Sequence, residues 1–280
     1  MHAVSVNLRT AGRYVIYALL SLNVAWFFRG ELSASELLGT ADGFKALITV
    51  FSETFDTLAW VVLILLFELE VSHIAPERLH GRLQWLLIAL RMACYSVIVF
   101  ALGGYWLMWE TVTTLQPAGD IDPCALVEQG YRYVAGLDRY PVLTSTTCQL
   151  LANEPLAFID GTRILGSIAQ LEHIGQIAMI DVINASAWLM VVIIMEAEVF
   201  LKLLDRFDTR WVRISKWLLS PLYLVLLGCA GYWLRHGEWL DAWDALLWLI
   251  AFAFIELNIL DWQARRQDHA RPLPESAHHP

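Results

Sequence analysis

Residues 184–199 read NASAWLMVVIIMEAEV, and the same spacing of polar residues occurs twice more in the chain. Residues 56–71 read DTLAWVVLILLFELEV, and residues 244–259 read DALLWLIAFAFIELNI. Each copy starts with Asp or Asn, has Trp four residues later and Glu eight residues after the Trp, and carries another polar residue two positions beyond the Glu. The positions between are almost all apolar. The three copies therefore predict three similar helices with polar groups at matching depths.

The composition predicts an all-α integral membrane protein. Hydrophobic residues make up 58% of the chain, compared with roughly 45–50% in soluble domains, and the mean hydropathy is +0.52. A helix needs about 20 consecutive apolar residues to cross a bilayer. Windows of this length predict six transmembrane helices, at 14–29, 55–75, 84–108, 179–203, 213–234 and 244–262.

The repeated spacing falls in the second, fourth and sixth of these segments, which predicts three repeats of a two-helix hairpin. A weaker echo supports this, because residues 104–107 and 231–234 both read GYWL near the ends of the third and fifth segments. We expect the first three spans within residues 1–108 and the last three within 179–264. An extracytoplasmic insert at 109–178 separates them, and a disordered cytoplasmic tail at 265–280 follows.

The distribution of Lys and Arg predicts the orientation, because cytoplasmic segments carry an excess of both. With both termini inside, twelve of the 19 basic residues lie on the cytoplasmic side. We therefore expect both termini in the cytoplasm, in a membrane such as the bacterial inner membrane. The formal net charge of −9 lies mainly on the outer side, which argues against nucleic acid as a partner.

The insert is expected to contain a disulfide and a helix. Cys124 and Cys148 both lie in this segment, and an oxidising compartment favours their pairing. Cys94 and Cys229 lie within spans and are expected to act as small apolar residues. We also expect a helix over 163–180 that leads into the fourth span.

The first and last polar positions of each copy lie on one helix face. They are 14 residues apart, which is about 40° short of four turns and about 21 Å along the axis. The first set is expected near the outer headgroups and the last set towards the inner end of the membrane. The first set is Asp56, Asn184 and Asp244, and the last set is Glu70, Glu198 and Asn258.

The shared glutamates, Glu68, Glu196 and Glu256, are the main candidates for a functional site. A carboxylate inside the apolar layer costs about 3 kcal/mol or more, so its presence there usually marks a functional position. Threefold packing of the three helices would gather the glutamates into a cation-binding ring. The alternative is that each glutamate pairs with a neighbouring cation. Arg91, within the third span, is expected to form a structural ion pair with Glu68 or Glu70.

The shared tryptophans, Trp60, Trp188 and Trp248, have two interpretations. Tryptophan is enriched at membrane interfaces, so the three side chains could anchor the outer end of each helix. Alternatively, they line a constriction and control passage by size or by dewetting. By the helical rise they lie about 12 Å outward of the glutamates.

These patterns predict a membrane protein that conducts or transports a small cation, with protons as one candidate, through the repeated glutamates. The alternative is a non-catalytic scaffold or accessory subunit that binds a partner through its insert. No nucleophile, base and orienting group can be assembled from the sequence, so we do not expect an enzyme. No cofactor or metal site is expected either. The lipid bilayer is one partner, and both a homo-oligomer and a second membrane protein are left open.

Overall fold

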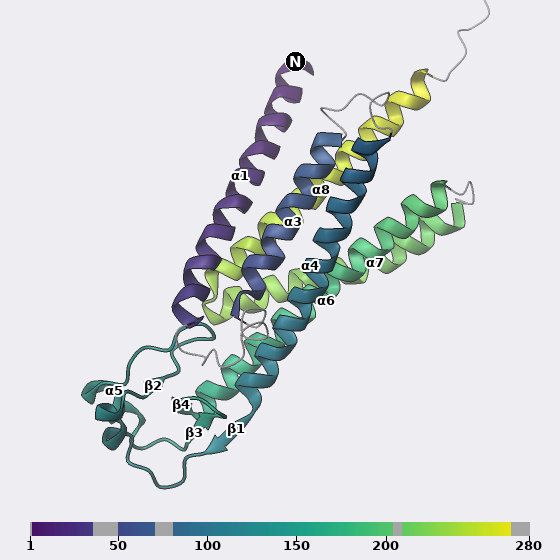
Figure 1. The fold of residues 1–280 in the computed structure, drawn as a ribbon. Helices are drawn as coiled ribbons and strands as arrows, with labels where there is room; N and C mark the ends of the chain where they lie inside the picture. Colours follow the sequence, from purple (N-terminus) through teal and green to yellow (C-terminus); the bar gives the residue numbers. More distant parts are fainter. Residues whose placement is uncertain (1, 36–49, 71–80, 204–208, 270–280) are drawn as a thin grey trace, which may run out of the picture.

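The structure is a computed structural model that describes residues 2–35, 50–70, 81–203 and 209–269. Six long helices dominate it (Figure 1): α1 (His2–Ser35), α3 (Ser52–Glu68), α4 (Arg82–Thr113), α6 (Ile168–Leu203), α7 (Thr209–His236) and α8 (Trp239–His269). The insert lies at one end of these helices, and the N-terminus lies at the other. The chain is therefore mostly helical, as its composition predicts.

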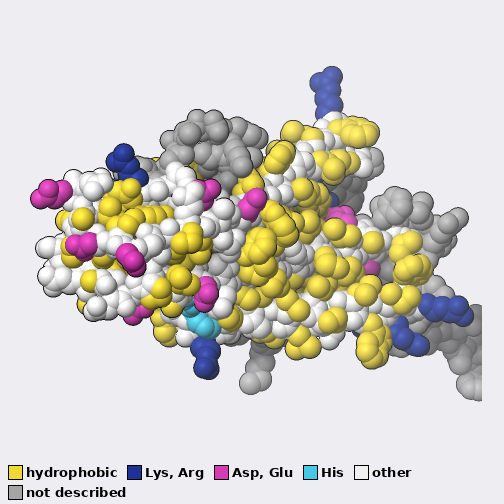
Figure 2. Space-filling view, turned by 90° about the horizontal axis from the view of Figure 1, so that it is seen from below, with side chains coloured by type: hydrophobic (Ala, Val, Ile, Leu, Met, Phe, Trp, Pro, Cys, Tyr) yellow, Lys and Arg dark blue, Asp and Glu magenta, His cyan; other side chains and the backbone are white. Residues whose placement is uncertain are grey.

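Four of the described helices are long and apolar enough to cross a membrane. These segments are Ala11–Leu32, Arg82–Thr113, Ile168–Glu198 and Arg213–His236. Large apolar side chains on their outer surfaces are exposed, including Leu22, Phe100, Ile193 and Leu224. Figure 2 shows such side chains covering much of the helical part on the face it presents. A surface of this kind is stable in lipid but not in water, so the integral-membrane prediction is supported.

The six long helices form a closed ring. Going around it, each helix packs against the next one in the chain, in the order α1, α3, α4, α6, α7 and α8, and α8 packs against α1. Between α7 and α8 the connection is very short, and Gly237 adopts a positive φ of 87° there. At the start of α3, the buried Glu31 of α1 accepts hydrogen bonds from the backbone N–H groups of Glu53 and Thr54. Glu31 thereby satisfies two donors that have no partner within α3.

The inside of the ring is an apolar core to which all six long helices contribute. Leu20, Ile64, Val191, Leu226 and Leu247 are almost completely buried within it. A second cluster joins the ring to the insert, where Val134 and Leu137 pack with Trp233 and Ala245. The insert is thus fixed onto one end of the ring by apolar contacts.

The insert is a small α/β unit. Its strands are β1 (Leu115–Pro117), β2 (Arg132–Tyr133), β3 (Leu156–Ile159) and β4 (Ile164–Ser167), in the sheet order β1-β3-β4-β2. Strand β3 is antiparallel to both β1 and β4, whereas β2 is parallel to β4. Two short helices, η3 (Pro123–Gln129) and α5 (Ser145–Leu151), lie beside the sheet. The expected helix over 163–180 was therefore wrong at its start, because β4 precedes α6.

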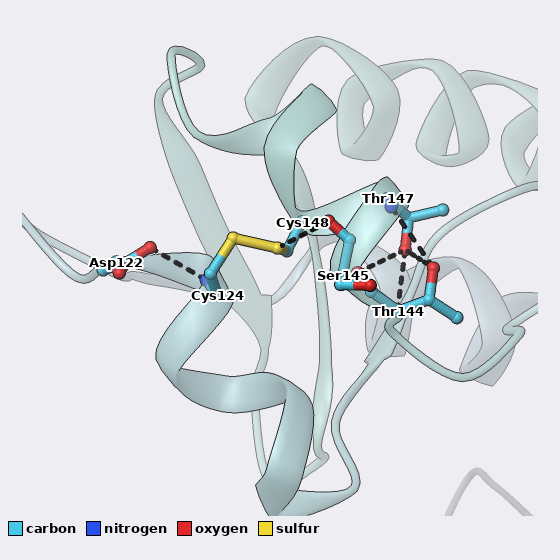
Figure 3. Close-up of a disulfide and its surroundings, with 6 residues drawn as sticks. All are labelled: Asp122, Cys124, Thr144, Ser145, Thr147 and Cys148. Carbon is cyan, nitrogen blue, oxygen red and sulfur yellow. Dashed lines mark hydrogen bonds between the residues drawn. A yellow bond between two sulfur atoms is a disulfide. The ribbon is translucent and has the colours of Figure 1, made fainter.

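The predicted disulfide is confirmed. Cys124 at the start of η3 is bonded to Cys148 in α5 (Figure 3), and Cys148 is almost completely buried. Thr144 caps α5 by accepting a hydrogen bond from the backbone N–H of Thr147, whose own hydroxyl accepts from the backbone N–H of Thr144. Asp122 caps η3 in a similar way, through the backbone N–H of Cys124. The bond therefore links two locally stable helix ends.

Candidate functional site

A polar cavity of about 50 Å³ lies inside the ring, at the end next to the insert. All six long helices contribute to its wall. Its lining residues are Phe27, Glu53, Asp56, Thr57, Trp60, Tyr105, Asp181, Asn184, Trp188, Trp233, Asp241, Asp244, Ala245 and Trp248. Five of these carry carboxyl groups, and none of the described lining residues is Lys, Arg or His.

The first polar position and the tryptophan of every copy meet in this cavity. Asp56, Asn184 and Asp244 lie in its wall, each followed one turn later by Trp60, Trp188 or Trp248. The three helices that carry them, α3, α6 and α8, alternate around the ring with α1, α4 and α7. The sequence repeat therefore corresponds to three positions around one cavity.

Trp60 packs against both Trp188 and Trp248 at the centre of the ring. The ring centroid of Trp60 lies 6.1 Å from that of Trp188 and 6.0 Å from that of Trp248. Phe252 contacts all three, at 4.7 to 6.5 Å between centroids. Each tryptophan is only 6–7% exposed. This placement favours the constriction interpretation over the interfacial one, because an interfacial anchor faces the headgroups.

Other tryptophans occupy the outer surface of the helices. Trp26, Trp85, Trp217 and Trp239 are 67–76% exposed. These residues have the exposure that an aromatic belt requires. The repeated tryptophans therefore differ from these four in being buried.

Three of the five carboxyl groups of the wall accept hydrogen bonds from neighbouring donors. The indole Nε1 of Trp60 donates to Oδ1 of Asp56 at 3.1 Å, which is the four-residue spacing of a helix face. Asn23 Nδ2 of α1 donates to Oδ1 of Asp244 at 2.8 Å. Trp233 Nε1 of α7 donates to Oδ1 of Asp181 at 3.1 Å. These bonds orient the carboxyl groups without supplying a positive charge.

Asn184 differs from its counterparts in the other two copies. Its Oδ1 atom is buried and has no hydrogen-bond donor in the part of the chain that the structure describes. A buried acceptor without a donor costs about 1–3 kcal/mol. Such an atom beside a polar cavity is suited to accept a hydrogen bond from a bound ligand or water.

The insert contributes negative charge near the cavity. Asp138 lies in the turn between Gly136 and Arg139, which packs beside the α7–α8 connection, and it interacts electrostatically with Asp181 and Asp241. Burial, together with the charge of Glu238, raises the pKa of Asp138 from 3.8 to about 6, while Arg139 partly opposes the shift. Arg139 also forms an ion pair of 3.9 Å with Glu238.

The shared glutamates contact neighbouring helices at the other end of the ring. Glu68 accepts hydrogen bonds from Arg13 Nη1 at 3.2 Å and from the hydroxyl of Tyr17 at 3.4 Å. Glu196 is exposed and accepts a hydrogen bond from the hydroxyl of Tyr95. The side chain of Glu256 lies outside the described part of the structure. The described glutamates are thus each engaged with a different helix, α1 or α4, and the structure shows no contact between them.

The last polar positions of the copies also lie at this end. Glu70 forms an ion pair with Arg91 Nη2, one of the two partners expected for this arginine. Glu198 is partly exposed on α6. The side chain of Asn258 lies outside the described part. The 14-residue spacing therefore separates a cavity at one end from interhelical pairs at the other.

Three of the carboxyl groups that line the cavity were not predicted from the sequence. Glu53, Asp181 and Asp241 each lie three residues before the first polar position of a copy. One helical turn separates the two positions, so both face the cavity. Extending the repeat by three residues towards the N-terminus would have found them. The intervening helices α1, α4 and α7 add one aromatic side chain each, Phe27, Tyr105 and Trp233.

Comparison with protein families, with curated proteins and with solved structures found no match to this chain. The function of this chain is therefore inferred from the cavity itself.

Proposed function

We propose that this chain is a six-span membrane protein of three helix hairpins that binds a small cation in the cavity and carries it across the bilayer. The observation that carries the proposal is the composition of the cavity wall. Five carboxyl groups face a space of about 50 Å³ without a lining Lys, Arg or His among the described residues. Carboxyl groups removed from water must either bind a proton or be compensated by positive charge, and a bound cation supplies that charge.

The matching lining residues of α3, α6 and α8 support the proposed repeat of three helix hairpins. Each of α3, α6 and α8 supplies an acid, a second polar residue and a tryptophan at the same spacing. In this proposal α3 and α8 are the second and sixth spans. Helix α3 has 17 residues, a length of about 25 Å at 1.5 Å per residue, which is near the thickness of the hydrocarbon layer.

The packing on the inner side of the tryptophans favours a transporter over an open channel. Trp60, Trp188 and Trp248 meet Phe252, and the apolar core of Ile64, Val191 and Leu247 fills the ring around them. A cation in the cavity can pass only if these side chains rearrange. Rearrangement of repeats around a fixed central site is a recurrent plan among transporters, although this parallel concerns architecture alone.

The proposed orientation places the insert and the cavity on the extracytoplasmic side. Twelve of the 19 basic residues then lie on the cytoplasmic side. The disulfide between Cys124 and Cys148 fits an oxidising compartment. The glutamates Glu68, Glu196 and Glu256 then lie on the part of their helices nearer the cytoplasmic side.

Reconstitution into liposomes tests this proposal. The purified protein is inserted into vesicles that enclose dyes sensitive to pH, to K⁺ or to Na⁺, and flux is measured in response to an imposed gradient. We expect a flux that Asp56→Asn and Asp244→Asn each reduce about tenfold or more. Asp120→Asn, which removes an exposed carboxylate of the insert, is the matched control and should leave the flux unchanged. A folded protein that gives no flux, and that instead co-purifies with a stoichiometric partner, would favour the scaffold alternative.

A further inference from the structure

We infer that the cation recognised by the cavity carries a primary ammonium group, an inference that rests on the proposed cation-binding function. The wall repeats three kinds of residue around the ring. Acids come from Glu53, Asp181 and Asp241, polar acceptors from Asp56, Asn184 and Asp244, and indoles from Trp60, Trp188 and Trp248. A terminal ammonium group has three N–H donors related by the same symmetry.

The second of these sets, Asp56, Asn184 and Asp244, has acceptor oxygens available for the N–H donors of such a group. Asp56 accepts hydrogen bonds from the side chains of Trp60 and Tyr105. Asp244 accepts hydrogen bonds from the side chains of Asn23 and Trp248. A carboxylate can accept about four hydrogen bonds, so each retains capacity for a ligand. Asn184 Oδ1 has no donor among the described residues. A ligand with N–H donors would satisfy this oxygen and add charge-assisted bonds to the two carboxylates.

The aromatic residues explain why an organic cation is favoured over a hydrated metal ion. Six aromatic side chains, one from each long helix, line the cavity: Phe27, Trp60, Tyr105, Trp188, Trp233 and Trp248. Aromatic faces attract cations, with tryptophan the strongest, and the attraction grows when the cation is removed from water. An alkylammonium ion offers both a charge and an apolar surface to such a wall.

Divalent metal ions fit the wall less well. Such ions need several oxygen ligands at about 2.0–2.6 Å from one point. In the part of the chain that the structure describes, no group of three or more His, Cys, Asp or Glu residues is placed to hold a metal ion.

Calorimetric titration of the full chain in lipid nanodiscs tests the inference. Methylammonium, ammonium, K⁺ and Ca²⁺ are titrated as chloride salts at constant ionic strength. We expect methylammonium to bind at least about tenfold more tightly than K⁺ or Ca²⁺ because it uses both the acceptors and the indoles. Tighter binding of ammonium than of methylammonium would show that the alkyl group does not contribute to binding. That result would overturn the inference that the ligand is an organic cation.

Two pairs of variants identify the contacts. Asn184→Leu should weaken methylammonium binding about tenfold because it removes the buried acceptor, whereas Asn184→Asp should preserve or tighten it. Trp188→Leu should weaken binding about tenfold, and Trp188→Phe should recover part of the loss because it keeps an aromatic face. Asp120→Asn should bind as the parent does. Thermal unfolding of each variant shows which variants are folded. Asn184→Asp and Trp188→Phe make the smallest changes, so they still test the inference if the leucine variants do not fold.

The outcomes separate this inference from the proposed function. If K⁺ or Ca²⁺ binds more tightly than methylammonium and displaces it, the ammonium inference fails and the cation-binding proposal stands. Equal methylammonium affinity in folded Asn184→Leu and in the parent also overturns the inference. If the folded parent binds none of the four cations and gives no flux in liposomes, both are overturned.

Discussion

The indoles of Trp60 and Trp188 lie 6.1 Å apart at the centre of the ring, although α4 separates their helices both in the chain and around the ring. Trp248 also contacts Trp60. These contacts cross the ring, whereas the main helix packing runs around it, from each helix to the next. The tryptophans thus connect α3, α6 and α8 and at the same time close the cavity on the side away from the insert. The contribution of the tryptophans to the stability of the protein can be tested separately from their functional role.

Removing either of these indoles should destabilise the protein. Trp60→Ala and Trp188→Ala each delete a buried aromatic ring, and such changes cost about 3–5 kcal/mol in the free energy of unfolding. The matched control is Trp217→Ala, because Trp217 is 76% exposed and its loss should cost about 0.5 kcal/mol or less. Denaturant titrations in detergent micelles, followed by circular dichroism, measure the difference. Equal losses for Trp188 and Trp217 would contradict the central packing.

The disulfide should stabilise the insert more than the helix ring. Cys124 and Cys148 are 24 residues apart, and closing a loop of this length is worth about 3 kcal/mol in the chain-entropy model. We expect the double variant Cys124→Ser, Cys148→Ser to increase hydrogen exchange in residues 115–167 and to leave α3 and α8 protected. Uniformly faster exchange over the whole chain would instead mean that the insert and the ring unfold as one unit.

The sequence predicted the polar positions of the cavity better than their role. The repeated spacing identified Asp56, Asn184 and Asp244, because a period of 3.6 residues determines which side chains share a face. It also suggested a glutamate ring, which depends on how far apart the helices are at that depth. The helices lie together next to the insert and spread apart at their other ends (Figure 1). Glu68 and Glu196 therefore find partners on adjacent helices.

The insert was the least predictable part. Strands β3 and β4 are four residues each, and their stability comes from pairing with each other and with β1 and β2. Such pairing is non-local, so a short apolar segment such as Ile164–Ser167 looks the same as the start of the helix that follows it. By contrast, the pairing of Cys124 with Cys148 was predictable, because only these two cysteines lie in the insert.

The stability of the insert should depend on the ionisation of Asp138. Its pKa is raised from 3.8 to about 6 by burial and by Glu238, so the folded state binds a proton more tightly than the unfolded state does. Stability should therefore fall as the pH rises from about 4 to about 6, and should then level off. We expect Asp138→Asn to abolish this fall and to gain roughly 1 kcal/mol at pH 7 after allowing for solvent screening. Thermal unfolding between pH 4.5 and 7.5, with Asp120→Asn as the control, measures both effects. A parent that becomes more stable over this interval would contradict the assigned pKa shift.

The proposed orientation predicts which sides of the membrane can be labelled. In a background with Cys94 and Cys229 replaced by Ala, a cysteine at Asp120 should react with an impermeant maleimide added to intact cells. A cysteine at Gln267 should react only after the membrane is opened. Because Asp120 is exposed in the insert, its labelling does not require any unfolding. Reaction of Gln267→Cys in intact cells, with Asp120→Cys protected, would reverse the orientation.

Neutralising the shared glutamates distinguishes local pairing from a common site. Glu68 is 6% exposed and lies 3.2 Å from Arg13, so Glu68→Gln leaves a partly buried arginine without its ion-pair partner. Breaking such a pair costs about 3–5 kcal/mol when it is fully buried, and we expect about 2 kcal/mol or more here. Glu196 is exposed and contacts the neutral hydroxyl of Tyr95, so Glu196→Gln should cost about 1 kcal/mol or less.

The unfolding free energy and the flux of each variant are measured together. If the glutamates act as local pairs, Glu68→Gln loses stability, Glu196→Gln is nearly neutral, and the selectivity of the flux is unchanged in both. Arg13→Gln leaves the more buried Glu68 carboxylate without Arg13 and should cost at least as much as Glu68→Gln. In the double variant the two losses should not add, because both changes remove the same ion pair. A common cation site requires a different pattern, in which Glu68→Gln, Glu196→Gln and Glu256→Gln are all folded and change the ion selectivity or the pH dependence to a similar extent. That result would place a second cation site at the inner end of the ring, and it would contradict the purely local role that the contacts of Glu68 and Glu196 indicate.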